Sequence, residues 1–333
     1  VLLVLASLIV VIAGLSAAQQ LLIPVLLALL LAILCSPAVS WLRDHRVPTV
    51  VAVLLVVLVL LGVFGVFGAV IGGSINGFME ATPRYQERID ALGAGVKTWL
   101  EGVGVDATQL NASEYFQPGS LIRLLGSGLT ALLSTLSNTF LVILILAFML
   151  LEAAVLPVKI RAALGRPEAD LRRFTKAARE IQKYLGLKTA ISAVTGLVIG
   201  TWVAILGLDF AVTWGFLAFL LNFIPNIGSI IAAVPAVLLA LVQLGLTEAL
   251  LVAAGFIVVN VTLGNVVEPQ LMGRTLGMST LVVFLSLVFW GWLWGPAGML
   301  LSVPLTMVVK ILLENCEDTR WLAVLLGPAS PPR

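Results

Sequence analysis

The sequence predicts an all-α polytopic membrane protein of about eight membrane segments, with two re-entrant helical hairpins in an inverted repeat. Composition is the first reason: 60% of the 333 residues are hydrophobic and 11% are charged, whereas a soluble protein carries about 25% charged residues. The mean hydropathy is +1.13. No soluble core could enclose so much apolar surface, so lipid is the expected surrounding. The second and third reasons are long apolar runs, and two apolar runs that are broken in a similar way.

Uninterrupted apolar runs mark the simple spans, because a spanning helix needs about 20 mostly apolar residues. The candidates of this kind are 1–18, 21–41, 50–71, 129–151 and 187–208. Apolar segments with interruptions follow at 212–244, 249–267 and 280–313.

Two polar segments lie between the apolar runs. The first, 72–128, carries an amphipathic stripe of apolar side chains, and the second, 152–186, carries a similar one. The stripes are Tyr85, Ile89, Leu92, Val96 and Trp99, and Leu171, Phe174, Ala178, Ile181 and Leu185. Both stripes fit packing against the protein's own helices or the bilayer surface, and recruitment of a partner protein is the alternative.

Charge gives the chain an orientation. Residues 159–188 contain nine Lys or Arg and three acids, and an excess of basic residues near span ends marks the cytoplasmic side. The same residues could instead only hold the helix against anionic lipid. With 152–186 in the cytoplasm, 72–128 is expected outside and the C-terminus inside.

The expected organisation follows from these assignments. It consists of scaffold helices at 1–71, an extracytoplasmic helical domain at 72–128, a span at 129–151, a basic cytoplasmic helix at 152–186, a transport domain at 187–313 and a cytoplasmic tail at 314–333.

The stretch "FLLNFIPNIGSIIAAVPAVLL", residues 219–239, contains a break that a simple span would not need. The preceding apolar arm, 212–224, would be a helix about 20 Å long, short of a hydrocarbon core of about 30 Å. Pro225 removes a backbone donor, while Asn226 and Gly228 suit a turn. Two short arms joined by such a turn predict a hairpin that enters and leaves the membrane on one side.

A similar pattern recurs about seventy residues later. "LGLDFAVTWGFLAFLL" begins at Leu206 and "LGMSTLVVFLSLVFWG" at Leu276; Val-Pro pairs follow at Pro235 and Pro304. The breaks between them read "PNIG" and "GPAG". Because one span separates the two hairpins, they should enter from opposite faces. This is the pattern of an inverted-repeat transporter, whose broken helices place a site near the midplane.

The stretches "IPNIGSIIAAVPAVLLAL", "NVVEPQLMGRTLGMSTLVVFLSLVFWG" and "GPAGMLLSVPLTMVVKILLE" resemble signature stretches of the autoinducer-2 exporter family of bacterial permeases. The resemblance covers most of the chain. It implies a multi-pass protein of the bacterial inner membrane that exports small polar solutes such as autoinducer-2. It also implies homo-oligomeric assembly, with a pentamer as the expected size, and cation/proton exchange as an activity proposed for some members.

Candidate site residues are the polar, charged and helix-breaking positions of the repeat. Those expected to contact a substrate or ion are Asn222, Pro225, Asn226, Gly228, Asn265, Glu268, Pro296 and Gly298. Those expected to act in gating or coupling are Asp209, Arg274, Pro235 and Pro304.

Glu268 carries the sharpest of these hypotheses, because it ends an apolar run and precedes Pro269. An ionisable group near membrane depth is costly, so it is a functional candidate. The alternative is a structural pair with Arg274 or a cap on nearby backbone. Asp209 could likewise be a solvated carboxylate at a helix end, and Asn265 a helix-to-helix hydrogen-bonding residue.

Several activities lack support in the sequence. His45 is the only histidine, and no Gly-x-x-x-x-Gly-Lys-Ser/Thr loop occurs, so neither an intramembrane protease nor an ATPase is expected. We expect a non-enzymatic secondary transporter with no cofactor and no nucleic-acid partner, driven by a proton or sodium gradient. A monovalent-cation/proton antiporter is the first alternative, and a membrane scaffold that binds partner proteins is the second.

Overall fold

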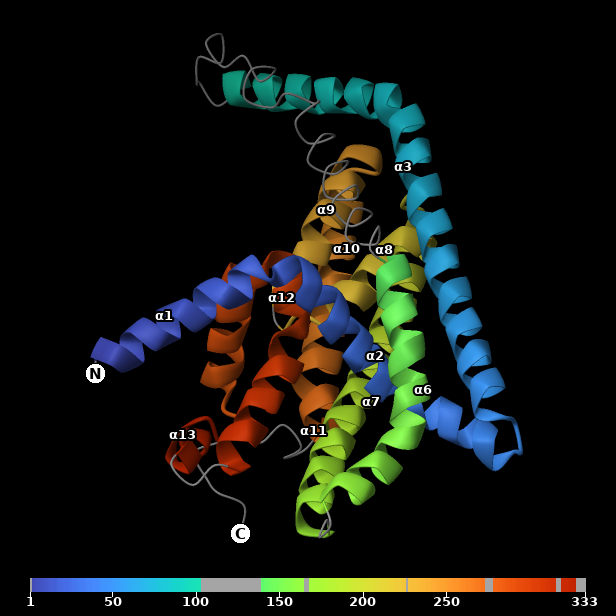
Figure 1. Ribbon diagram of the computed structural model, residues 1–333. Coiled ribbons are helices and arrows are strands. Elements are labelled where there is room, and N and C mark those ends of the chain that lie inside the picture. Colours follow the sequence, from blue (N-terminus) through green and yellow to red (C-terminus); the bar gives the residue numbers. More distant parts are fainter. Residues whose placement is uncertain are drawn as a thin grey trace.

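A computed structural model describes residues 2–102, 139–164, 168–225, 227–272, 278–315 and 319–327 of the chain. Within these ranges the regular structure is helical throughout (Figure 1). The helices are α1 (Leu2–Ala17), α2 (Gln19–Asp44), α3 (Thr49–Gly102), α6 (Thr139–Leu164), α7 (Glu168–Ile205), α8 (Ala211–Leu221), α9 (Ile227–Gln243), α10 (Leu246–Val259), the π-helix η2 (Asn260–Val267), α11 (Glu268–Met272), α12 (Thr280–Asn315) and α13 (Arg320–Leu325).

Five of the described helical segments are long and apolar enough to cross a membrane. They are Gln19–Asp44, Thr49–Gly95, Ala178–Ile205, Leu246–Leu271 and Thr280–Glu314. Three shorter apolar helices accompany them, at Thr139–Ala153, Ala211–Leu221 and Ile227–Gln243. The all-α class with several membrane-spanning helices is therefore confirmed, whereas the number of eight segments stays a prediction.

Helix α3 runs without interruption through the expected boundary between residues 71 and 72. Figure 1 shows it bending sharply near its far end. Pro83 is the proline inside this helix, and proline is the usual cause of a sharp kink. Tyr85 of the predicted stripe is buried. The side chains of Leu92, Val96 and Trp99, together with residues 103–138, lie outside the part that the structure describes.

The first half of the chain has its own apolar core, formed where α2, α3 and α6 pack together. Ala28 on α2 and Ala52 on α3 are fully buried, as is Leu146 on α6. Small side chains on two of the three helices let the backbones approach closely, which is typical of membrane helix packing. These helices belong to the part of the chain for which the sequence predicts a scaffold half, and that role stays a prediction.

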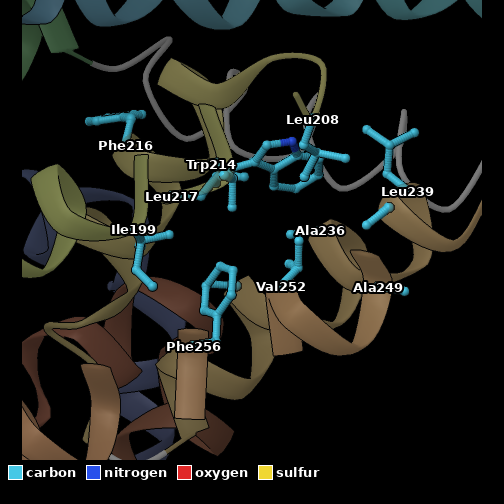
Figure 2. Close-up of a cluster of buried hydrophobic side chains, with 14 of the residues drawn as sticks. Ile199, Leu208, Trp214, Phe216, Leu217, Ala236, Leu239, Ala249, Val252 and Phe256 are labelled. Carbon is cyan, nitrogen blue, oxygen red and sulfur yellow. The ribbon is translucent and has the colours of Figure 1, made fainter. Parts of the chain in front are cut away.

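The second half builds a larger core from α7, α8, α9 and α10, and α3 adds Ile71, Phe78 and Tyr85 to it. Figure 2 shows Trp214 and Leu217 of α8 on the side of Ala236 of α9 and Val252 of α10, whereas the ring of Phe216 stacks on that of Phe67 of α3 with the centroids 3.7 Å apart. Helix α8 has only 11 residues, or about 17 Å of helix. It is therefore too short to span a hydrocarbon core of about 30 Å.

Helices α8 and α9 pack against each other as a helical hairpin, and α12 folds back on itself in the same way. Trp294 and Gly295 leave the helical conformation, and Gly295 has φ 62, a value that favours glycine. Trp290 Nε1 donates to Thr306 Oγ1 at 3.1 Å, although sixteen residues of straight helix would separate them by about 24 Å. Both predicted broken segments therefore form helical hairpins, and their entry into the membrane from opposite faces stays a prediction.

The second hairpin attaches the two halves to each other. Trp290 and Trp294 pack against side chains of α1 and α2, and Trp294 Nε1 donates to the carbonyl oxygen of Leu15 at 3.1 Å. On its other side α12 packs on α7 through Val303 and Met307. The hairpin thus lies between the scaffold helices and α7.

Candidate functional site

The two hairpin tips have matching geometry. A Cβ atom at Gly228 would overlap the carbonyl oxygen of Leu221, and one at Gly298 would overlap that of Trp290. The same hypothetical atoms would lie 3.1 Å from Cβ of Ile224 and 3.0 Å from Cβ of Trp294. Gly228 and Gly298 are seventy residues apart, as are Ile224 and Trp294. In both hairpins the returning arm therefore begins against the backbone of the first arm, which only glycine permits.

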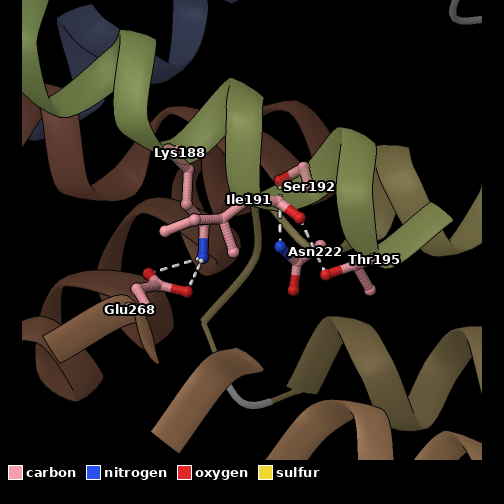
Figure 3. Close-up of polar contacts among 6 residues, drawn as sticks. All are labelled: Lys188, Ile191, Ser192, Thr195, Asn222 and Glu268. Atoms are coloured by element: carbon pink, nitrogen blue, oxygen red, sulfur yellow. Dashed lines mark hydrogen bonds and ion pairs between the residues drawn. The ribbon is translucent and has the colours of Figure 1, made fainter. Parts of the chain in front are cut away.

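A buried ion pair lies beside the first tip. Lys188 of α7 directs its ammonium group at both carboxylate oxygens of Glu268, with Nζ–O distances of 2.7 and 2.8 Å (Figure 3). The Lys188 side chain is 4% exposed and that of Glu268 is 18% exposed. A charge-assisted contact to both oxygens is a strong form of hydrogen bonding. It compensates the burial of two charges that would be very costly alone.

The polar face of α7 continues from the pair toward the first tip. Ser192 lies one turn beyond Lys188, and its hydroxyl oxygen accepts a hydrogen bond of 2.9 Å from Nδ2 of the buried Asn222. Asn222 is the residue at which α8 ends. Figure 3 shows Asn222 and Glu268 on the same side of α7. The end of the first hairpin arm and the Glu268 carboxylate are therefore held by neighbouring turns of one helix.

Glu268 stands directly after an irregular helical segment. Residues Asn260–Val267 form the π-helix η2 between α10 and α11. π-helical turns are rare, and they occur frequently at functional sites. The carboxylate of Glu268 thus follows directly on a distorted helical segment, and its functional role stays a prediction.

The remaining predicted residues lie in three different settings. Asn265 is exposed on η2, and Pro296 is exposed at the second tip. Pro235 lies inside α9 and Pro304 inside α12. Pro225 lies in the turn between α8 and α9. Asn226 and Arg274 lie outside the described residues, so the predicted pairing of Glu268 with Arg274 stays a prediction, and the partner that the structure describes is Lys188.

Asp209 occupies a different place from Glu268. Its carboxylate accepts a hydrogen bond of 2.9 Å from Tyr85 of α3, and its backbone N–H donates to Oε1 of Gln243 at 2.9 Å. Asp209 follows the C-terminal end of α7, whereas Lys188 lies about 26 Å of helix before that end. Asp209 therefore joins α3, α9 and the turn before α8, and it is separate from the ion pair.

Comparisons with known proteins identify the kind of protein. The profile of the AI-2E family transporters matches residues 5–318. The chain belongs to the AI-2E transporter family. It is 41% identical over 327 residues to the AI-2 transport protein TqsA of Escherichia coli strain K12, a match that covers 98% of this chain and 95% of that protein. It is 38% identical to the putative transport protein YhhT of the same strain, covering 99% of this chain and 95% of the relative.

This AI-2E family transporter is a multi-pass membrane transport protein and not an enzyme. Its described residues contain no group of three or more His, Cys, Asp or Glu side chains that could hold a metal ion. The chemistry that the site offers is a carboxylate, an ammonium group, a hydroxyl and an amide along one face of α7. Such groups bind and release polar solutes or cations without covalent steps.

Lys188 is the functional candidate that sequence reasoning missed in this transporter. It closes the basic segment 159–188, so it counted as a cytoplasmic charge; the structure instead buries it. The signal was present, because Lys188 continues the apolar stripe that contains Ile181 and Leu185 by one further step of three residues. A charged residue on the buried face of a helix predicts a buried partner.

Proposed function

We propose that this transporter exports a small polar solute such as autoinducer-2 through residues 187–313. The matched hairpins are the observation that carries the proposal: two broken helices, seventy residues apart, with glycines pressed against the first arm in the same way. Paired broken helices bind substrate in inverted-repeat transporters. The name of the AI-2 transport protein TqsA supports autoinducer-2 as the solute to test first.

The proposed path lies along the polar face of α7. Asn222, Ser192, Lys188 and Glu268 supply donors and acceptors there, and the tip residues Pro225 and Gly228 follow Asn222 in the chain. In this proposal the two hairpins act as gates, and the transport half moves as a rigid body against the scaffold half. Freed backbone at the tips is tolerable because it is buried in protein or lines a cavity.

Orientation and assembly are part of the proposal. The basic segment 152–186 and the C-terminus face the cytoplasm, and residues 72–128 face outward, in the bacterial inner membrane. The protein works as a homo-oligomer, for which a pentamer is the expected size. Many large apolar side chains of the single chain are exposed, including Leu58, Leu197 and Phe148, and lipid or neighbouring subunits would cover them.

Solute flux into proteoliposomes tests the function. Purified protein should move radiolabelled autoinducer-2 or a related small polar solute faster than protein-free liposomes do, and a proton or sodium gradient should change the rate. Absence of flux for every solute of a broad panel would contradict the proposal.

A monovalent-cation/proton antiporter is the second candidate, and the buried Lys188–Glu268 pair is the observation that favours it. In the same liposomes, sodium added without any solute should then dissipate an imposed pH gradient. If the gradient persists unless solute is present, this alternative is wrong.

Thiol labelling tests the opposite entry of the two hairpins. Single cysteines at Ser229 and Ala297, in a protein whose Cys35 and Cys316 are replaced by serine, should both be partly protected from a membrane-impermeant thiol reagent added outside intact cells. Each position lies near a hairpin tip, which the proposal buries at membrane depth. A cysteine at the exposed Glu87, in the segment 72–128 that the proposal places outside, serves as a non-tip control that should be fully labelled. Complete labelling of either tip, as on a surface loop, would mean that its segment crosses the membrane.

A further inference from the structure

The Lys188–Glu268 pair holds two helices together at the cost of removing two charged groups from water. Replacing a buried ion pair by apolar side chains of similar size is often neutral or stabilising. Around the pair the packing is already apolar, since Leu263 of η2 and Met307 of α12 meet Leu185 and Ile191 of α7 in one cluster. Apolar side chains at positions 188 and 268 would therefore be enough to hold these helices together. The presence of two charges there needs an explanation other than stability.

The position of the pair couples the two repeat units. Lys188 lies on α7, the helix that leads into the first hairpin, and Glu268 begins α11, which follows α10 and η2 and precedes the second hairpin. The titratable or charged side chains described at this point are Tyr184, Lys188 and Glu268, and Tyr184 lies within electrostatic range of the carboxylate. The neighbouring side chains from α12, Val303 and Met307, are apolar. Glu268 therefore has one described cationic partner at this point.

We propose that Glu268 is a binding site for a small monovalent cation and that Lys188 is its tethered occupant. The ammonium group at 2.7 and 2.8 Å from the two oxygens holds the position that a free cation would take. The carboxylate side chain is 18% exposed and the ammonium side chain 4%, so an incoming cation approaches from the carboxylate side. A coupling cation then competes with Lys188 when the transport half moves. This inference rests on the proposed transport function.

Thermal unfolding of purified full-length protein tests the site without any solute. Lys188→Met removes the ammonium group but keeps a side chain of similar length, which leaves Glu268 open. Its Tm should be low in N-methylglucamine chloride and should rise by several degrees when sodium or methylammonium replaces that bulky cation at constant ionic strength. The double variant Lys188→Met/Glu268→Gln has lost the carboxylate, so its Tm should not depend on the cation.

Binding of radioactive sodium supplies a second measurement that begins with the wild-type protein. Wild-type protein should bind sodium weakly and saturably, and Lys188→Met should bind it about tenfold more tightly, a difference of about 1.4 kcal/mol. Glu268→Gln should abolish binding. A Tm of Lys188→Met that is indifferent to the cation, or no saturable binding by wild type even at molar sodium, would overturn the inference.

The two proposals fail separately in these experiments. If sodium binding is absent but solute flux persists, the cation site is wrong and transport stands. If sodium binds at Glu268 but no solute crosses the liposome membrane, the cation site stands and the proposed solute export is wrong.

Discussion

Replacing Gly228 or Gly298 by alanine should prevent the corresponding hairpin from closing. The added Cβ would overlap a backbone carbonyl oxygen, that of Leu221 or of Trp290. A flexible side chain could move aside, but a carbonyl oxygen at the end of a packed helix cannot. The cost should therefore reach or exceed about 3 kcal/mol, the upper end of the usual range for overpacking. Thermal unfolding of the purified variants, or their loss during purification, measures it.

Gly62→Ala is the matched control for these two variants. Gly62 also lies within an apolar helix, α3, but a Cβ there meets nothing within 4 Å. Alanine is the better helix former by about 1 kcal/mol, so the control should be at least as stable as the wild type. If Gly228→Ala and Gly298→Ala unfold like this control, the close approach of the arms is wrong, and so is the structural equivalence of the tips.

The helical class and both hairpins could be predicted because they depend on local properties of the chain. The high apolar content requires a lipid surrounding, and the Pro-Asn-Ile-Gly stretch from Pro225 and the Gly-Pro-Ala-Gly stretch from Gly295 each favour a break in the helix. The equivalence of the tips was also visible as a repeat in the sequence. Glu268 could be singled out as a candidate because a charge at the end of an apolar run is unusual.

The contacts between distant segments could not be predicted in the same way. The hydrogen bond from Trp294 to the carbonyl oxygen of Leu15 joins residues 279 positions apart, and no local sequence pattern predicts it. Lys188 was assigned to the cytoplasmic segment because basic residues surround it in sequence, although the helix turns it to the inside. The continuity of α3 through residue 72 could not be predicted either, because the boundary expected there follows from polarity and says nothing about where a helix ends.

The contact between α3 and the first hairpin matters most for the proposed motion. The hydroxyl groups of Ser74 and Thr213 are joined by a hydrogen bond, and the hydroxyl group of Tyr85 donates a hydrogen bond of 2.9 Å to the carboxylate of Asp209. Between them the ring of Phe210 lies against Gly77. Phe210 has φ 61, a left-handed conformation that costs a non-glycine residue energy. Since α3 also belongs to the core of the scaffold half, a rigid-body movement of the transport half has to break these contacts.

A disulfide between residues 74 and 213 should therefore stop transport reversibly. The hydroxyl oxygens of Ser74 and Thr213 are in direct contact, so cysteines at both positions place their sulfur atoms within bonding reach. In a protein without Cys35 and Cys316, oxidation of Ser74→Cys/Thr213→Cys should abolish solute flux into proteoliposomes, and reduction should restore it. Each single-cysteine variant, treated with the same oxidant, should keep its flux. If the fully cross-linked double variant transports as fast as it does after reduction of the disulfide, α3 moves together with the first hairpin. The boundary of the moving unit would then lie between α3 and the helices α2 and α6.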